Sequence, residues 1–296
     1  MSDAAAALKS LQPKGRFFVG IDSDGCVFDS MEIKHKECFC PNFINDFELQ
    51  AVSKYAREVW EFVNLYSATR GVNRFKAVLR ALDLLKARPE TQSRGVEPPR
   101  LEGLRRWVER ETRLGNPALE AEVEQNPDED LSHALRWSKD VNETVARIVR
   151  GVPPFPYVRE SLEKMQESAD IVVVSQTPTE ALEREWQEHG IDAYARFIAG
   201  QEAGTKSEHL QFAAGGKYEE NRLLMIGDAP GDLKAARAVD ALFFPVIPGD
   251  EEASWQRLLE EGLDRFFSGT FAGSYQSELL SGFEKALPET PPWEKG

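Results

Sequence analysis

Two aspartates, Asp22 and Asp24, stand where an apolar run of the sequence stops. The run begins at Phe17, and Gly25 follows the second aspartate directly. Side chains at i and i+2 leave an extended chain on the same side, so the two carboxylates would crowd each other. Such a pair calls for a proton on one carboxylate, or for a metal ion or another cation between them. The alternative is a tight turn in which Asp24 and Gly25 supply the geometry.

A second apolar run, residues 169–174, stops at a small hydroxyl, that of Ser175. Thr177, Pro178 and Glu180 fit a capping box with proline at the first helical position, so the pattern gives Thr177 a structural role. Ser175 has no such role. It is therefore a candidate contact for a phosphate group or an oxyanion, and the alternative is a plain turn serine.

Lys206 is predicted to lie in the first turn of a helix, because Thr205 and Glu208 have capping-box spacing around it. The N-terminus of a helix carries partial positive charge, so a lysine there is unfavourable by a few tenths to ~1 kcal/mol. An anionic partner would reverse the sign. The alternative is a solvated lysine, since costs of this size are small.

A third apolar run, residues 221–227, ends with Asp228 at its tip and Asp232 four residues on. Asp232 has a structural alternative as a helix N-cap, and Asp228 has none. The three runs alternate with helical patterns, which predicts an α/β fold with a parallel sheet. Open sheets of this kind place their chemistry at the carboxyl ends of the strands.

The order of these motifs along the chain is specific, although each alone is weak. FFVGIDSDG, IVVVS, TK and MIGDAPGD resemble the four signatures of the haloacid dehalogenase superfamily of phosphohydrolases, over roughly residues 15–30 and 152–250. The resemblance implies a Rossmann-like parallel-sheet core with an inserted all-helical cap domain. It also implies a magnesium-dependent phosphatase that hydrolyses a small phosphorylated metabolite through an aspartyl-phosphate intermediate.

The resemblance gives the matching residues catalytic roles. Asp22 would attack phosphorus and become phosphorylated. Asp24 would protonate the leaving oxygen and then activate the hydrolytic water. Ser175 and Lys206 would hold the phosphoryl oxygens, and Gln176 is a further candidate for substrate binding.

The same resemblance implies a magnesium site. Its ligands would be Asp22, the backbone carbonyl of Asp24, and Asp228, with Asp232 as an additional or indirect ligand. Magnesium takes oxygen ligands, which these residues supply. A dianionic phosphate would be repelled by the carboxylates, so the ion and Lys206 are needed to invert the local field.

The interval between the first two motifs holds the predicted cap. Its apolar residues recur at three- and four-residue spacing almost throughout, which indicates helices. We therefore predict a core domain of residues 1–30 and 152–296, with a C-terminal helical extension, and a helical cap of residues 31–151. In the resembling family such a cap is mobile and closes over the active site.

Two arginines in this interval are candidates for substrate binding. Thr69 could cap a helix, and Arg70 and Arg74, four residues apart, would then face one way near its N-terminus. Such a pair could clamp an anionic part of the substrate. The alternative is a solvated basic face.

Composition restricts the partners. The 296-residue chain has 36 Lys and Arg against 50 Asp and Glu, a net charge of −14, which argues against nucleic acid or an anionic membrane surface. No apolar run reaches ~18 residues, and the N-terminal MSDAAAALKS lacks the regions of a signal peptide. We therefore expect a cytoplasmic protein, and the sequence does not specify its oligomeric state.

The three cysteines, at 26, 38 and 40, form no disulfide framework. His35, Cys38 and Cys40 could be metal ligands, but their spacing is not that of a usual zinc site.

Two other functions share these residues. A phosphoryl mutase of the same superfamily would return the phosphoryl group to the substrate instead of to water, a difference that depends on how water is excluded. A non-catalytic phosphate-binding or phospho-acceptor regulator also uses an acidic cluster with a hydroxyl and a lysine. Receiver domains of that class are much shorter than this chain and have no cap.

Overall fold

The computed structural model describes residues 2–294, which fall into two compact units. The sheet unit comprises residues 2–30 and 151–287, and the helical unit comprises residues 31–150 and 288–294. Residues 288–294 therefore group with the helical unit, whereas the sequence led us to place them with the core.

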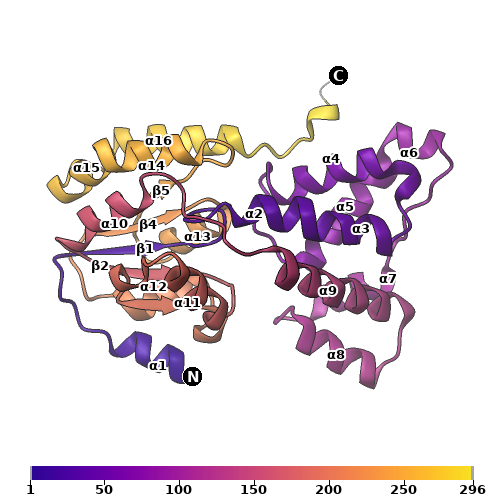
Figure 1. The fold of residues 1–296 in the computed structure, drawn as a ribbon, viewed down its shortest axis with the longest axis horizontal. Helices are drawn as coiled ribbons and strands as arrows, with labels where there is room; N and C mark the ends of the chain where they lie inside the picture. The colour runs from indigo at the N-terminus through magenta and orange to yellow at the C-terminus, as the bar shows by residue number, and fades with distance from the viewer. Residues whose placement is uncertain (1, 295–296) are drawn as a thin grey trace. The chain divides into compact units, whose positions relative to one another are not determined.

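The sheet unit is built on five parallel strands in the order β3-β2-β1-β4-β5 (Figure 1). The strands are β1 (Phe17–Ile21), β2 (Ala169–Val174), β3 (Phe197–Ala199), β4 (Leu223–Gly227) and β5 (Leu242–Pro245). The chain passes from β1 to β2 on one side and later returns to β4 on the other. This order places a topological switch point at the carboxyl end of β1, and the predicted α/β fold is confirmed.

The register of the central strands brings their carboxyl ends to one level. Ile21 of β1 pairs with Val173 of β2 and with Ile226 of β4, and each of the two neighbours ends one residue later. The residues that follow these strands therefore emerge at the same edge of the sheet.

Apolar side chains cover both faces of the sheet, as a buried parallel sheet requires. Val19 and Ile21 belong to one apolar cluster, which includes Trp186 and Trp255, and Phe18 belongs to another on alternate residues. The helices of this unit are α1 (Asp3–Ser10), α10 (Val158–Gln166), α11 (Thr179–Glu188), α12 (Lys206–Ala214), α13 (Pro230–Arg237), α14 (Glu251–Arg257), α15 (Leu263–Ser268) and α16 (Ser274–Ala286), with short turns at Asp192–Tyr194, Gln201–Ala203 and Leu258–Gly262.

The helical unit packs around a core that contains Trp60, Phe75, Trp107 and Trp137. Its helices are α3 (Cys40–Asp46), α4 (Ser53–Asn64), α5 (Arg74–Ala87), α6 (Pro89–Ser93), α7 (Glu102–Arg110), α8 (Asn116–Gln125) and α9 (Glu129–Ile148), with a π-helical turn at Lys34–Phe39 and 3-10 turns at Gln50–Val52 and Pro292–Glu294. Helix α2 (Ser30–Ile33) begins at the last residue of the sheet unit. Across residues 2–294, no helix combines the length and the apolar character that crossing a membrane would require.

The start of α5 differs from the prediction. Asn73 caps this helix, since its side chain accepts the backbone N–H two residues on (3.0 Å). Thr69, the predicted cap, instead donates its hydroxyl to a backbone carbonyl in α4 (2.7 Å). Arg70 therefore lies in a turn before the helix, and Arg70 and Arg74 do not share a helical face through i,i+4 spacing.

Candidate active site

Asp22 is the first residue after β1, and its carboxylate is fixed at both oxygens. It is 5% exposed. Oδ1 accepts the backbone N–H of Ser23 (2.8 Å), and Oδ2 forms an ion pair with Nζ of Lys206 (2.6 Å). The strand thus delivers a buried, oriented carboxylate to the switch point of the sheet.

Lys206 is the first residue of α12, and the predicted capping box of Thr205 and Glu208 is present. Its Nζ contacts Asp22 Oδ2 and Asp232 Oδ1, both at 2.6 Å. Burial alone would lower the pKa of Lys206, but the two carboxylates outweigh it and raise this pKa. The anionic partners also offset the unfavourable position of a lysine at a helix N-terminus. The alternative prediction, in which the Lys206 side chain is solvated, is therefore wrong.

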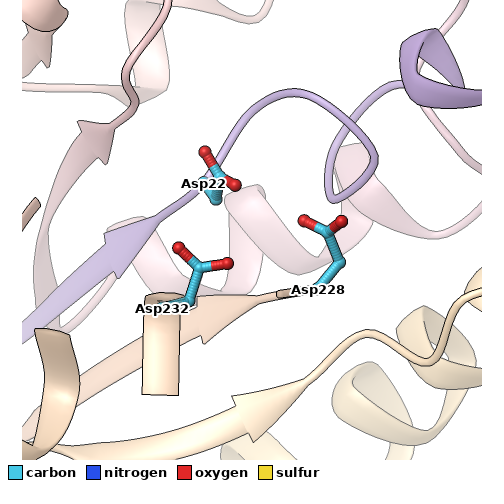
Figure 2. A group of neighbouring side chains, drawn as sticks. All are labelled: Asp22, Asp228 and Asp232. Atoms are coloured by element: carbon cyan, nitrogen blue, oxygen red, sulfur yellow. The ribbon is translucent and has the colours of Figure 1, made fainter. Parts of the chain in front are cut away.

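Asp228 and Asp232 complete an acidic cluster with Asp22. Asp228 directly follows β4, and Asp232 lies in the first turn of α13. Ligand oxygens of the three buried carboxylates lie within 4.8 Å of one another, and Figure 2 shows the carboxylates turned toward a common space. A Cβ on Gly227 would lie 2.4 Å from that of Asp232, so only glycine at this position lets α13 approach so closely.

Asp232 combines a structural role with a place in the cluster. Helix α13 begins at Pro230, so Asp232 is its third residue and not the N-cap that the alternative interpretation required. Oδ2 accepts the backbone N–H of Ala229 (3.0 Å), as the acid of a capping box does, and Oδ1 faces Lys206.

The electrostatics of the cluster fit a hard cation. Burial raises the pKa of the Asp22 carboxyl, Lys206 opposes this shift, and the nearby Asp232 and Asp228 carboxylates raise the pKa further. Like charges this close disfavour full ionisation unless a cation lies among them. Three buried carboxylates with converging oxygens are a donor set that suits magnesium.

Asp24 is held by two hydroxyls that the sequence did not identify. Ser30 Oγ donates to its Oδ1 (2.5 Å), and Thr177 Oγ1 donates to its Oδ2 (2.7 Å). The structural role predicted for Thr177 is wrong, because α11 begins at Thr179 with Pro178 as the preceding residue and no side-chain cap. The later helix start leaves the Thr177 hydroxyl available to Asp24. The sequence did carry a signal for this contact, because two hydroxyl side chains, Ser175 and Thr177, follow the end of β2.

We expect Thr177→Val to lower kcat/KM by roughly tenfold, since a hydrogen bond to a charged group is worth about 1.5–3 kcal/mol and valine keeps the shape of threonine. Thr177→Ser retains the hydroxyl and should recover most of the activity. Steady-state kinetics of both variants on one phosphate ester provide the measurement. Full activity in Thr177→Val would mean that the hydroxyl does not matter, and a loss in Thr177→Ser alone would mean that the methyl group does.

Ser175 follows β2 and is buried. Its Oγ accepts the backbone N–H of Thr177 (3.2 Å), which orients the hydroxyl at the same sheet edge as Asp22. Gln176 is exposed, and its amide donates to the backbone carbonyl of Gly204 (2.9 Å), just before α12. Gln176 therefore links the second and third motif segments.

The two arginines predicted to bind substrate belong to the helical unit. Arg70 is buried, and its Nη1 donates to the backbone carbonyl of Leu65 (3.0 Å). Arg74 donates from Nη1 to Ser138 and Asn142 of α9. Neither side chain belongs to a solvated basic face.

The alternative zinc site is not formed. Within residues 2–294, the acidic cluster is the one group of His, Cys, Asp and Glu side chains close enough to hold a metal ion. Cys38 and Cys40 are buried free thiols, and His35 Nδ1 faces Nε1 of Trp60 (3.3 Å). These residues contribute to the packing of the helical unit.

A family model supports the resemblance first seen in the sequence. No curated protein matches the chain. Solved structures similar to it include a predicted phosphoglycolate phosphatase from Haemophilus somnus (14% identity, 79% of this chain and 86% of that chain, TM-score 0.43). Others are a subfamily IA hydrolase of the HAD superfamily from Geobacter sulfurreducens (17%, 79% and 90%, 0.37) and a haloacid dehalogenase-like hydrolase from Streptococcus pneumoniae (14%, 86% and 98%, 0.43).

At these identities and TM-scores the likeness says nothing of the substrate of this chain. The family assignment depends instead on a family model, which matches residues 19–240. This span runs from within β1 through α13 and contains the candidate residues of all four motifs. The chain belongs to the haloacid dehalogenase-like hydrolase family.

Proposed function

We propose that this chain is a magnesium-dependent phosphatase that hydrolyses a small phosphorylated metabolite through an aspartyl-phosphate intermediate. The observation that supports this function best is the buried carboxylate of Asp22, fixed by Lys206 at 2.6 Å and followed two residues later by Asp24, whose carboxylate two hydroxyls orient. A nucleophile and a proton donor at one sheet edge are what two-step phosphoryl transfer requires.

In the first step a carboxylate oxygen of Asp22 forms a bond to phosphorus, and the bond from phosphorus to the ester oxygen breaks. Asp24 in its protonated form gives its proton to that oxygen, so an alcohol leaves instead of an alkoxide. Ser175 and Lys206 hold the non-bridging oxygens, and the ammonium of Lys206 offsets their charge.

In the second step Asp24, now a carboxylate, takes a proton from water as the water oxygen attacks phosphorus. The bond between phosphorus and Asp22 breaks, and inorganic phosphate and the free carboxylate are the products. One residue thus acts as acid and then as base, which returns the site to its starting protonation state.

Asp22, Asp228 and Asp232 would hold magnesium, together with the backbone carbonyl of Asp24. When bound, the ion supplies positive charge that offsets the carboxylates and the phosphoryl oxygens. The acidic cluster supports this assignment, because its oxygens converge and suit a hard cation.

The test is hydrolysis of a panel of phosphate monoesters with magnesium and with EDTA. We expect release of inorganic phosphate that EDTA abolishes and excess magnesium restores. Asp228→Ala should raise the magnesium concentration for half-maximal rate by about tenfold or more, since one of few oxygen ligands is lost. Glu220→Ala, which removes an exposed carboxylate from the same unit, is the control.

An Asp228→Ala variant with unchanged magnesium dependence would mean that the ion is held elsewhere. Transfer of the phosphoryl group back to the organic product, without release of phosphate, would identify a mutase. No turnover of any ester by the wild-type protein would contradict both enzymatic functions and leave the phosphate-binding regulator.

A further inference from the structure

Two buried indole groups of the sheet unit hold the turn that follows β1. Ser23, between the two candidate catalytic aspartates, is completely buried, and its Oγ accepts the Nε1–H of Trp186 in α11 (3.0 Å). The backbone carbonyl of Cys26 accepts the Nε1–H of Trp255 in α14 (2.7 Å). Both tryptophans are fully buried, so water cannot replace either acceptor without a rearrangement of the turn.

Backbone hydrogen bonds make this turn compact. The carbonyl of Ser23 accepts three N–H groups from later in the turn, those of Cys26 (3.3 Å), Val27 (2.9 Å) and Phe28 (3.2 Å). Asp24 lies in the chain between Ser23 and Cys26, the two residues that the indoles bind. The positions of these two residues therefore restrict where the backbone carbonyl and the carboxyl group of Asp24 can lie.

Helix α11 contacts the turn through both of its ends. Thr177, two residues before the helix, donates its hydroxyl to Asp24, and Trp186 lies in the last turn of the helix. The ring of Trp186 also packs edge-on against Phe28, with 6.2 Å between centroids and 80° between the planes. The segment that carries Ser175 and the turn that carries Asp22 are thus held to each other by more than the sheet.

Trp255 comes from a different part of the chain. It lies in the C-terminal helical extension, outside the residues 19–240 that the family model matches, and 229 residues separate it from Cys26. The indole N–H of Trp255 is nevertheless directed at the turn between the strand end and α2. The extension therefore contributes a directional contact to the first motif, in addition to apolar packing.

We propose that Trp186 and Trp255 are positioning residues, whose indole N–H groups fix the turn at residues 22–28 so that Asp22 and Asp24 keep the geometry that the two steps require. The inference rests on the proposed function, since it concerns the same two carboxylates. Neither tryptophan reacts with the substrate. An error of ~1 Å in the position of a reacting group lowers a rate on the order of 100-fold, so such contacts have a large effect on turnover.

The first arm of the test is kinetic. Trp255→Phe removes the N–H and keeps an aromatic ring. We expect kcat to fall roughly ten- to hundredfold while KM changes by about twofold or less, because positioning acts on bond formation and not on substrate binding. Trp137→Phe is the matched control, since Trp137 is also fully buried and its Nε1 has no hydrogen-bond partner within residues 2–294. An equal fall in kcat in the control, or none in Trp255→Phe, would overturn the inference.

A double-mutant cycle tests the bond of Trp186 itself. Ser23→Ala removes its acceptor and Trp186→Phe removes its donor. If the two residues act through this bond, the double variant loses no more activity than the more damaged single variant. Losses that multiply would mean that the two side chains act independently, and Trp186 would then have no positioning role.

The second arm needs no substrate. Backbone hydrogen exchange, followed by mass spectrometry, should be about tenfold faster at residues 23–28 in Trp186→Phe and Trp255→Phe and unchanged in β2. Trp137→Phe should leave the turn as in the wild type. Faster exchange in β2 as well would mean that the tryptophans only stabilise the sheet unit, and the inference would be wrong.

The two arms separate this inference from the proposed function. If the wild-type protein hydrolyses no phosphate ester, the proposed function fails, and the exchange of residues 23–28 still decides whether the indoles fix the turn. If the turn exchanges faster but kcat is unchanged, the order of the turn does not serve the reaction and the inference is wrong. Benzothienylalanine at position 255 replaces the N–H by sulfur and keeps the ring size, and it provides a second variant if Trp255→Phe unfolds.

Discussion

Asp22→Asn should lower phosphatase turnover by about 10⁴-fold or more, the scale on which loss of a covalent nucleophile acts. An amide cannot form the aspartyl phosphate, although it matches the carboxylate in size. Its oxygen can still accept the N–H of Ser23, so the loop keeps one of its two fixed contacts. Turnover of one good ester, measured with saturating magnesium, provides the test.

Two controls make this result interpretable. Mass spectrometry of the variant checks for deamidation of the introduced asparagine back to aspartate, which would restore activity. Asp240→Asn makes the same chemical change at an exposed position where the backbone is left-handed (φ 54°), a conformation that asparagine tolerates, and it should leave turnover unchanged. Near-normal turnover in an Asp22→Asn sample free of deamidation would remove Asp22 from the role of nucleophile.

The sequence predicted the sheet and much of the candidate site because these signals are local. Each apolar run became a strand, and Asp22, Ser175 and Asp228 stand directly after β1, β2 and β4. Lys206 was identified from its place in a capping box, which the structure confirms. A polar residue at the end of a buried apolar run needs a partner from elsewhere in the fold. Its type and position therefore indicate a candidate site before the structure is known.

Contacts between distant segments were not predictable in the same way. Thr177 bonds to Asp24 although 153 residues separate them, and a shift of the helix start by one residue decides which role its hydroxyl has. Residue propensities do not decide between the two helix starts, because threonine is suited both to an N-cap position and to a loop. Asn73 displaced Thr69 as the cap of α5 for the same reason.

The end of the chain shows the same limit. The ring of Trp293 packs edge-on against Phe62 (5.4 Å between centroids), and the guanidinium of Arg88 lies 4.5 Å from its centroid. Ala68 donates its backbone N–H to the carbonyl of Pro288 (3.2 Å). These contacts place residues 288–294 in the helical unit, and no periodic pattern in so short a segment indicates them.

Asp24→Asn should lower kcat/KM by ~10²–10⁴-fold for an alkyl phosphate and much less for para-nitrophenyl phosphate, because general acid catalysis contributes on that scale only where the leaving group needs a proton. An alkoxide is a poor leaving group and must be protonated as it departs. Nitrophenolate is stable as an anion. Asparagine can occupy the same volume but cannot give up a proton at the required rate.

The choice of kcat/KM isolates the step that this prediction concerns. Formation of the aspartyl phosphate ends the part of the reaction that kcat/KM reports, so loss of the base in the second step lowers kcat without entering this ratio. A series of esters with graded leaving-group pKa values then gives a slope, which should be steeper for Asp24→Asn than for the wild-type protein. Ser30→Ala and Thr177→Val each remove one hydrogen bond to Asp24 but keep its carboxyl group. They should lower kcat/KM across the whole ester series and steepen its dependence on leaving-group pKa less than Asp24→Asn does. An equal loss across the whole series would mean that Asp24 positions the loop or the backbone carbonyl at the metal site and does not deliver the proton.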